Sequence, residues 1–252
     1  MTVHFIGAGP GAPDLITVRG QNLLAQADVI IYAGSLVNPA LLDKARPGCE
    51  IHDSATMTLD QTIDVIQTAQ AAGKMTVRLH SGDPSLYGAI HEQMRRLDQL
   101  GIDYDICPGV SSFSAAAAAL RIEYTVPEVT QSVIVTRMPG RTPMPPREAV
   151  AELARHGSSM VIFLSTGLLN ELSADLIAAG HSPEEPAAIV HKASWPDERV
   201  VGCTIATLAT AAAEQGIRST ALIVVGPCLT HSDKVSRLYA ADFSTEFRQA
   251  SL

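Results

Sequence analysis

The sequence predicts an α/β protein with two domains, a mostly parallel sheet in the first and a mixed sheet in the second. Short apolar runs alternate with amphipathic segments through residues 3–120, which is typical of parallel strands covered by helices on both faces. A length of 252 residues, with 46% hydrophobic and 17% charged side chains, suits one large domain or two of ordinary size. The alternation loosens near 121–130, so we place the domains at 1–122 and 123–230, with a loosely held tail over 231–252.

Apolar runs and turn residues locate the elements of the first domain. The runs place strands at 3–6, 29–34, 49–52, 75–80 and 103–106. Helices are expected at 18–27, 39–44, 58–73 and 113–120. Thr17 is a suitable cap for the first of these helices, and Gly73 is a suitable terminator for the third.

The second domain continues the alternation but reverses direction once. Strands are expected at 132–136, 160–164, 187–192, 199–203 and 220–226, with helices ending near 156 and covering 167–179 and 205–215. Trp195-Pro196-Asp197-Glu198 is typical of a chain reversal, so the strand that follows it should return antiparallel to the one before. The sheet of this domain is therefore expected to be mixed.

The stretch from Val77 to Gly88 contains the most informative junction. A buried strand stops in the turn Gly82-Asp83-Pro84, and a helix is expected to start near Ser85. This order places the carboxylate of Asp83 at the carboxyl end of a strand, where open α/β sheets bind ligands. Read alone, Gly-Asp-Pro is also simply a well-made turn.

The first glycine loop, Gly7 to Asp14, raises a different possibility. Gly7, Gly9 and Ala12 satisfy the spacing of the dinucleotide-binding fingerprint, which suggests an oxidoreductase. Pro10 and Pro13, however, remove amide donors that would bind a pyrophosphate, and no acid ends the second strand to hold a ribose. The loop is better suited to backbone contact with another ligand.

Composition limits the partners and the location. The net charge of −8 argues against broad nucleic-acid binding, and no apolar run reaches the length of a membrane span, so we expect a cytoplasmic protein with no membrane partner. The four cysteines have no CxxC spacing, which suggests neither a metal site nor a disulfide framework.

Several motifs together resemble the tetrapyrrole methyltransferases. They are Gly7-Ala8-Gly9-Pro10-Gly11 with Asp14 to Thr17, the strand from Asp28 to Tyr32, Gly82-Asp83-Pro84 and Pro108-Gly109-Val110-Ser111-Ser112, in family order across residues 3–228. Tyr32 to Val37, His80-Ser81 before the Gly-Asp-Pro turn, Gly140 to Pro143 and Lys192 to Glu198 are similar to the branch that methylates carbon 11 of the corrin precursor precorrin-4.

The resemblance implies a two-domain homodimer that binds S-adenosylmethionine in the cleft between its domains and releases S-adenosylhomocysteine. The matching cofactor positions are Pro10, Ser81, Gly82, Asp83, Leu86, Tyr87, Ser111, Ser112, Phe163, Leu164, Ala188, Thr220 and Ala221. Asp83 is expected to orient the cofactor by accepting hydrogen bonds. No residue is assigned as a general base, because attack of an electron-rich carbon on a sulfonium methyl depends mainly on alignment.

The expected substrate, a polycarboxylate macrocycle, requires local positive charge on an acidic protein. We expect a basic trough that includes Arg78, His80, Arg137, Arg141, Arg147 and Lys192, with Tyr32 lining the substrate cleft. The same arginines would otherwise be ordinary solvated charges. Trp195 is open to three interpretations: stacking on the macrocycle, a hinge or a dimer contact.

Three other functions are consistent with parts of the sequence. The chain could act on another tetrapyrrole, such as uroporphyrinogen III, a different precorrin or the cobalt form of precorrin-4. It could be a dinucleotide-dependent oxidoreductase that uses the first glycine loop. It could also bind the cofactor without turnover, as a ligand or assembly module.

Overall fold

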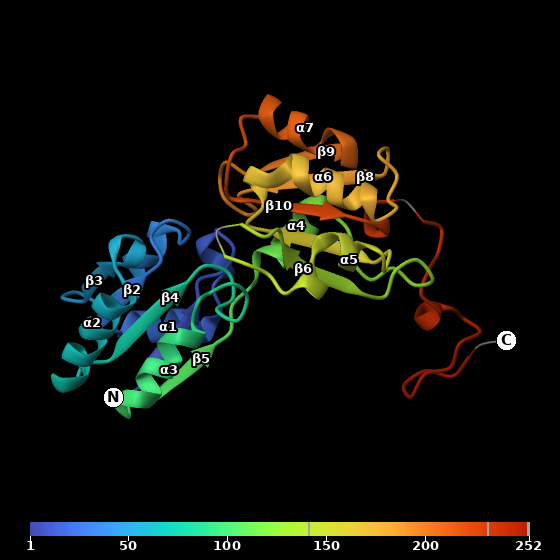
Figure 1. Cartoon of the computed structure of the whole chain (residues 1–252). Coiled ribbons are helices and arrows are strands. Elements are labelled where there is room, and N and C mark those ends of the chain that lie inside the picture. Colours follow the sequence, from blue (N-terminus) through green and yellow to red (C-terminus); the bar gives the residue numbers. More distant parts are fainter. Residues whose placement is uncertain (141, 231, 251–252) are drawn as a thin grey trace. The chain divides into compact units, whose positions relative to one another are not determined.

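The computed structural model describes residues 1–140, 142–230 and 232–250, and its chain divides into two compact units (Figure 1). The first unit consists of Met1–Ala116 and Lys192–Glu198, and the second of Ala117–His191 and Arg199–Leu252. From the sequence we expected the junction near residue 122 and the whole of 192–198 in the second domain. The chain thus returns once to the first unit, between two strands of the second.

The first unit contains a five-stranded parallel sheet in the order β3-β2-β4-β1-β5. Its strands are β1 (Val3–Gly7), β2 (Val29–Tyr32), β3 (Glu50–Asp53), β4 (Thr76–His80) and β5 (Tyr104–Cys107). The apolar runs of β1, β2 and β4 form the centre of the sheet because helices bury their side chains on both faces, whereas the edge strands β3 and β5 are partly exposed. This confirms the parallel sheet expected from the sequence.

The helices of the first unit begin and end at recognisable signals. They are α1 (Val18–Gln26), α2 (Leu59–Ala71) and α3 (His91–Leu100), with the 3-10 helices η1 (Pro13–Leu15), η2 (Pro39–Lys44) and η3 (Ser54–Thr56). Helix α4 (Ser112–Leu120) begins in the first unit and crosses into the second after Ala116. The Thr17 hydroxyl accepts a hydrogen bond from the amide of Gly20 at 3.1 Å, as expected of a cap. Leu24 packs on one face of the sheet, and Ile63 and Leu97 pack on the other.

The second unit contains a mixed sheet in the order β6-β7-β10-β8-β9. Its strands are β6 (Val133–Arg137), β7 (Ser159–Phe163), β8 (Pro186–His191), β9 (Arg199–Thr204) and β10 (Ala221–Val225). Strands β6 and β7 are parallel, whereas β10 runs antiparallel to β7 and β8, and β9 antiparallel to β8. The expected reversal around Trp195 is therefore confirmed.

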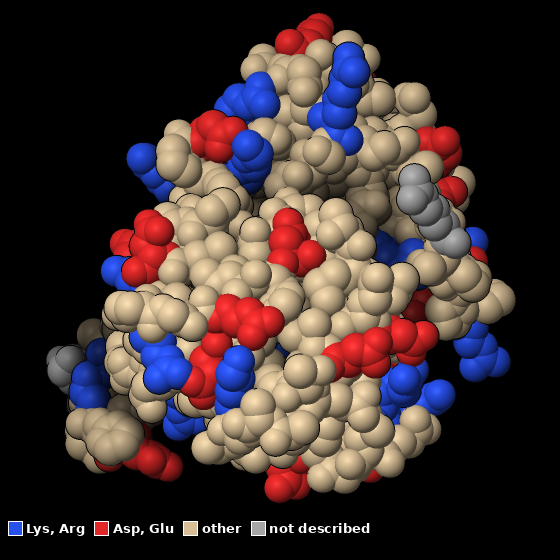
Figure 2. Space-filling view, turned by 90° about the vertical axis from the view of Figure 1, so that its left-hand side faces the viewer, with Lys and Arg blue, Asp and Glu red and all other residues tan. Residues whose placement is uncertain are grey.

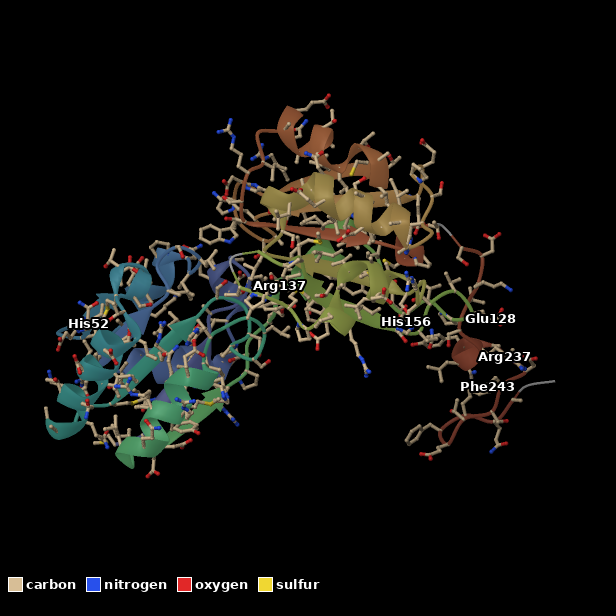
Figure 3. All side chains as sticks on the ribbon, viewed as in Figure 1. His52, Glu128, Arg137, His156, Arg237 and Phe243 are labelled. Atoms are coloured by element: carbon tan, nitrogen blue, oxygen red, sulfur yellow. The ribbon has the colours of Figure 1, made fainter. Side chains whose placement is uncertain are left out.

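Short helices cover a single apolar core in this unit. They are α5 (Val150–Ala154), α6 (Leu169–Ala178) and α7 (Leu208–Glu214), with η4 (Pro146–Glu148), η5 (Thr166–Leu168), η6 (Ile205–Thr207) and η7 (Pro227–Leu229). A further 3-10 helix, η8 (Arg237–Tyr239), follows in the exposed segment after β10 and has no buried residue. In the segment after β10, the guanidinium of Arg237 lies 5.7 Å from the ring centre of Phe243 (Figure 3). No helix among the described residues is long and apolar enough to cross a membrane.

Candidate functional site

Three loops meet at the carboxyl ends of neighbouring strands in the first unit. The sheet order places β1 between β4 and β5, so the loops that follow these strands, 81–88, 7–12 and 108–112, lie side by side. Gly9 and Gly82 exchange two backbone hydrogen bonds, of 3.2 Å and 2.8 Å. Backbone pairing therefore continues beyond the strands and joins two of the loops.

The junction requires glycine because the three backbones touch. A Cβ atom on Gly7 would lie 2.5 Å from both the Cα of Gly109 and the carbonyl oxygen of Gly82. A Cβ atom on Gly109 would lie 2.2 Å from that same oxygen. Gly82 also has a φ of 61°, in the left-handed region that favours glycine. The glycines of all three motifs thus serve one close approach.

The carboxylate of Asp83 fastens two of these loops together. Its Oδ2 accepts a hydrogen bond from the amide of Gly109 at 2.8 Å, and its Oδ1 accepts from the amide of Ser85 at 2.8 Å and from the Ser85 hydroxyl. Partial burial tends to raise the pKa of Asp83, but the hydrogen bonds from Ser85 and Gly109 outweigh it and the pKa is lowered. All of these donors come from the protein's own loops, and the cofactor-orienting role expected of Asp83 stays a prediction.

A strained turn, not a helix, follows Asp83. We expected a helix from about Ser85, but residues 84–87 form a turn, residues 88–90 are irregular and α3 begins at His91; we refer to residues 84–89 as the strained turn. Tyr87 and Ala89 have φ values of 57° and 51°, which a helix cannot contain. The Tyr87 side chain is 44% exposed as a result. Strained non-glycine residues of this kind cluster at functional sites.

The segment 192–198 covers the first glycine loop. The indole Nε1 of Trp195 donates a hydrogen bond to the carbonyl oxygen of Pro10 at 3.0 Å, and the Ser194 hydroxyl accepts one from the amide of Ala12 at 3.0 Å. A Cβ atom on Gly11 would lie 2.1 Å from the indole ring. The tryptophan therefore fills the space beside this loop, which does not favour the dinucleotide interpretation. Sequence reasoning missed Ser194, because nothing local indicates a contact with a residue 182 positions earlier.

Candidate residues of the second unit gather at one edge of its sheet. The strand register pairs Arg137 with Phe163 and Ala221 with His191, so the ends of β6, β7 and β8 and the start of β10 are level. Leu164 is 66% exposed and has a φ of 53°, and Thr220 has the same φ. Ala188 lies three residues before the end of β8 and is only 3% exposed, so the structure does not bring it to this edge.

Two residues expected in a basic trough are instead buried in the first unit. Arg78 is 7% exposed, and its guanidinium donates to Gln93 and to the carbonyl oxygen of Ile31. His80 is 4% exposed, and burial, reinforced by the charge of Arg78, lowers its pKa to about 3, so it is neutral. Arg78 and His80 lie two residues apart in β4, so their side chains point to the same face of the sheet, and helices cover both faces. Neither side chain supplies positive charge at the surface.

The other expected substrate residues lie nearer the surface. The Arg137 guanidinium donates to the carbonyl oxygens of Met138, Thr142 and Pro143, which ties down the proline-rich loop after β6 (Figure 3). Arg147 is exposed, and Tyr32, at the end of β2, is partly exposed. The Lys192 ammonium pairs with Asp197 at 2.6 Å. Arg141 lies outside the described residues.

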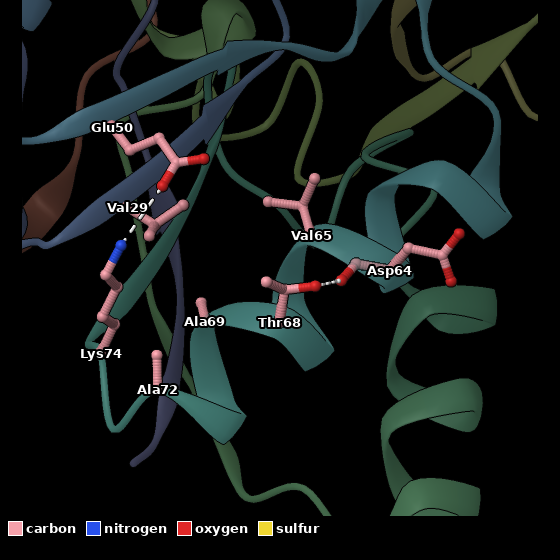
Figure 4. A pocket seen from close by; sticks show the side chains of 8 residues that line it. All are labelled: Val29, Glu50, Asp64, Val65, Thr68, Ala69, Ala72 and Lys74. Carbon is pink, nitrogen blue, oxygen red and sulfur yellow. Dashed lines mark hydrogen bonds and ion pairs between the residues drawn. The ribbon is translucent and has the colours of Figure 1, made fainter.

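The charged side chains and the pocket described below, outside the three-loop junction, do not point to another function. Acidic and basic side chains are interspersed on the face drawn in Figure 2, and no group of three or more His, Cys, Asp or Glu in the described part of the chain could hold a metal ion. A pocket of about 210 Å³ lies at the amino ends of β2 and β3, opposite the three-loop junction (Figure 4). Its Lys74 and Glu50 are paired at 3.4 Å, and we assign it no function.

Comparison with known proteins agrees with this geometry. The family model of tetrapyrrole (corrin/porphyrin) methylases matches residues 2–209. A cobalt-precorrin-4 C(11)-methyltransferase of Methanocaldococcus jannaschii is 48% identical, over 98% of this chain and 96% of that protein. A precorrin-4 C(11)-methyltransferase of a Sinorhizobium species is also 48% identical, over 98% of each chain. The X-ray structure of a cobalt precorrin-4 methyltransferase superposes with a TM-score of 0.89 at 46% identity, covering 91% of this chain and 96% of that one.

Proposed function

Because the chain belongs to the tetrapyrrole (corrin/porphyrin) methylases, we propose that it methylates carbon 11 of precorrin-4, or of its cobalt form, in cobalamin biosynthesis. The methyl donor is S-adenosylmethionine. Two relatives of equal identity, 48%, act according to their names on the metal-free and on the cobalt substrate, so identity supports both forms equally.

The three-loop junction is the observation that carries this proposal. Its glycines let the three loop backbones approach closely where three strands end, and Asp83 joins two of the loops through hydrogen bonds. Loops locked in this way are suited to orienting a cofactor at the carboxyl edge of a parallel sheet. We propose that Pro10, Ser81, Gly82, Leu86, Tyr87, Ser111 and Ser112 contact the cofactor in the first unit, and Phe163, Leu164, Thr220 and Ala221 in the second.

The reaction asks little of the protein in proton transfer. The cofactor supplies a methyl group on a positively charged sulfur, which becomes neutral as an electron-rich ring carbon takes the methyl. The residues of the chain therefore act by holding the reacting atoms in line. Such alignment alone can lower the activation free energy by roughly 7–11 kcal/mol. Buried His80 is neutral and has no surface access, so we give it no part in proton transfer.

The carboxylates of the substrate require cations. We retain Arg137, Arg141, Arg147 and Lys192 for this role and propose that Tyr32 lines the substrate cleft. Arg147→Ala and Arg141→Ala should each raise the dissociation constant for the tetrapyrrole severalfold and leave that for S-adenosylhomocysteine unchanged. Unchanged tetrapyrrole binding in both variants would exclude these two arginines.

The decisive experiment separates substrate forms and positions. The purified protein is incubated with methyl-labelled S-adenosylmethionine and either precorrin-4 or cobalt-precorrin-4, and NMR locates the new methyl group. Label at carbon 11 of either compound supports the proposal. Label at a different carbon, or no label on either compound when another tetrapyrrole is methylated, would refute it. Thermal stabilisation by S-adenosylhomocysteine but not by NAD separates this function from an oxidoreductase.

The same family resemblance leads us to propose a homodimer in the cytoplasm. Light scattering coupled to size-exclusion chromatography should give twice the 26.6 kDa mass of the chain. A monomer at micromolar concentration would contradict this part of the proposal. Fractionation of cells that express the protein should place it with cytoplasmic markers.

A further inference from the structure

A line of buried polar contacts runs beneath the strained turn that follows Asp83. The Nε of Arg78 in β4 donates to the Oε1 of Gln93 in α3 at 3.0 Å. The Nε2 of Gln93 donates in turn to the carbonyl oxygen of Ala89 at 2.9 Å. Gln93 thus connects the central sheet to Ala89, the last residue of the turn.

The arrangement is costly for a core. Burial lowers the pKa of Arg78 to about 10, and no carboxylate among the described residues forms an ion pair with it. Its guanidinium is satisfied by Gln93 and by the carbonyl oxygen of Ile31. An apolar pair would fill the same space without desolvating a charge. A role beyond packing is therefore indicated.

The turn 84–89 has a strained backbone conformation that needs stabilising contacts. Tyr87 and Ala89 are both left-handed, and a Cβ atom on Gly88 would lie 2.2 Å from the carbonyl oxygen of Pro84, so the chain folds tightly back on itself. Such a conformation persists only where its surroundings hold it. Asp83 binds the first part of the turn through Ser85, and Gln93 binds the last part through Ala89.

We propose that Gln93, oriented by Arg78, is a positioning residue that holds the turn 84–89 in the conformation that receives the cofactor. Leu86 and Tyr87, the residues of this turn that we assign to cofactor contact, lie between the two fastenings. The inference rests on the proposed function for the identity of the ligand. It adds a residue pair that touches no ligand and acts by reducing the freedom of the loop before binding.

The test compares Gln93→Met with Gln99→Met, the same substitution at an exposed position of the same helix. In the free protein, Gln93→Met should speed amide hydrogen exchange in residues 84–90 and leave β1 unchanged. The dissociation constant for S-adenosylhomocysteine, measured by calorimetry, should rise about tenfold, while Gln99→Met matches the wild type.

Gln93→Glu separates positioning from simple stability. The glutamate retains an acceptor for Arg78 but loses the amide donor to Ala89, so it should fold well and still show fast exchange and weak binding. Wild-type exchange at 84–90 in either variant, or wild-type affinity in Gln93→Glu, would overturn the inference. Failure of the wild type to bind S-adenosylhomocysteine would defeat the proposed function instead, and the exchange measurement would still decide whether Gln93 holds the turn.

Discussion

Gly109→Ala tests whether the three-loop junction is as tight as its geometry indicates. The added Cβ would lie 2.2 Å from the carbonyl oxygen of Gly82 and 2.6 Å from the Cα of Gly7, both backbone atoms. Restoring ordinary contact requires the loops to separate by roughly 1 Å. The 2.8 Å hydrogen bond from the Gly109 amide to Asp83 would then stretch beyond hydrogen-bonding range.

The expected loss follows from these two effects. Overpacking costs about 1–3 kcal/mol, and a lost hydrogen bond to a charged group about 1.5–3 kcal/mol, so we expect the unfolding free energy to fall by roughly 2.5–6 kcal/mol. For a chain of this size, at about 2–4 °C per kcal/mol, that corresponds to a drop in Tm of roughly 5–24 °C. A displacement near 1 Å at the site should also weaken S-adenosylhomocysteine binding.

Thermal unfolding followed by circular dichroism and calorimetric titration with S-adenosylhomocysteine measure both quantities. Gly167→Ala is the matched control, because a Cβ atom there meets nothing within 4 Å. Its Tm and affinity should stay at the wild-type values. If Gly109→Ala kept the wild-type Tm and affinity, as the control should, the junction would have room for a methyl group and the reasoning would be wrong.

Three further predictions concern single contacts. Asp83→Asn should lower the unfolding free energy by about 1–2 kcal/mol at pH 7. Since the folded pKa of Asp83 lies below its ordinary 3.8, the difference between variant and wild type should begin to shrink as the pH falls towards 3.8 and should be lost once the pH is below the folded pKa; a difference that does not shrink with falling pH would contradict the assignment. Leu164→Gly relieves the strain of a φ of 53° at an exposed position. Urea unfolding should therefore show an unfolding free energy within about 1 kcal/mol of the wild type, while the affinity for S-adenosylhomocysteine falls severalfold. A large loss of stability with unchanged affinity would contradict this interpretation. Trp195→Phe removes the donor to the Pro10 carbonyl and should cost the first unit about 1 kcal/mol in urea unfolding, whereas no change would show that the hydrogen bond is dispensable.

Much of the fold and the family could be predicted because their signals are local. Apolar runs, capping residues and the reversal at Trp195 mark elements within a few residues of themselves, and the structure confirms both sheets. The motif glycines also pointed to the ends of β1, β4 and β5. These strands are neighbours in the sheet, so motifs far apart in sequence necessarily meet.

The errors arose where tertiary contacts override local preference. Tyr87 and Ala89 are ordinary helix residues, yet the fastenings at Ser85 and Gln93 hold them left-handed. Arg78 was misplaced because a strand buried on both faces gives no sign of which side chains reach solvent. In each case the deciding partner lies in another element.

The first unit takes residues 192–198 from the far side of the unit boundary, and this has a consequence for synthesis on the ribosome. A nascent chain that has reached residue 116 has every strand of the parallel sheet but lacks the indole that covers Gly11. At about 5–20 residues per second, the missing piece arrives roughly 4–16 s later. A polypeptide truncated before Ser194 would contain the parallel sheet but never gain the indole of Trp195 that covers Gly11. Cutting the chain at one position therefore cannot give two fragments that each contain a complete unit.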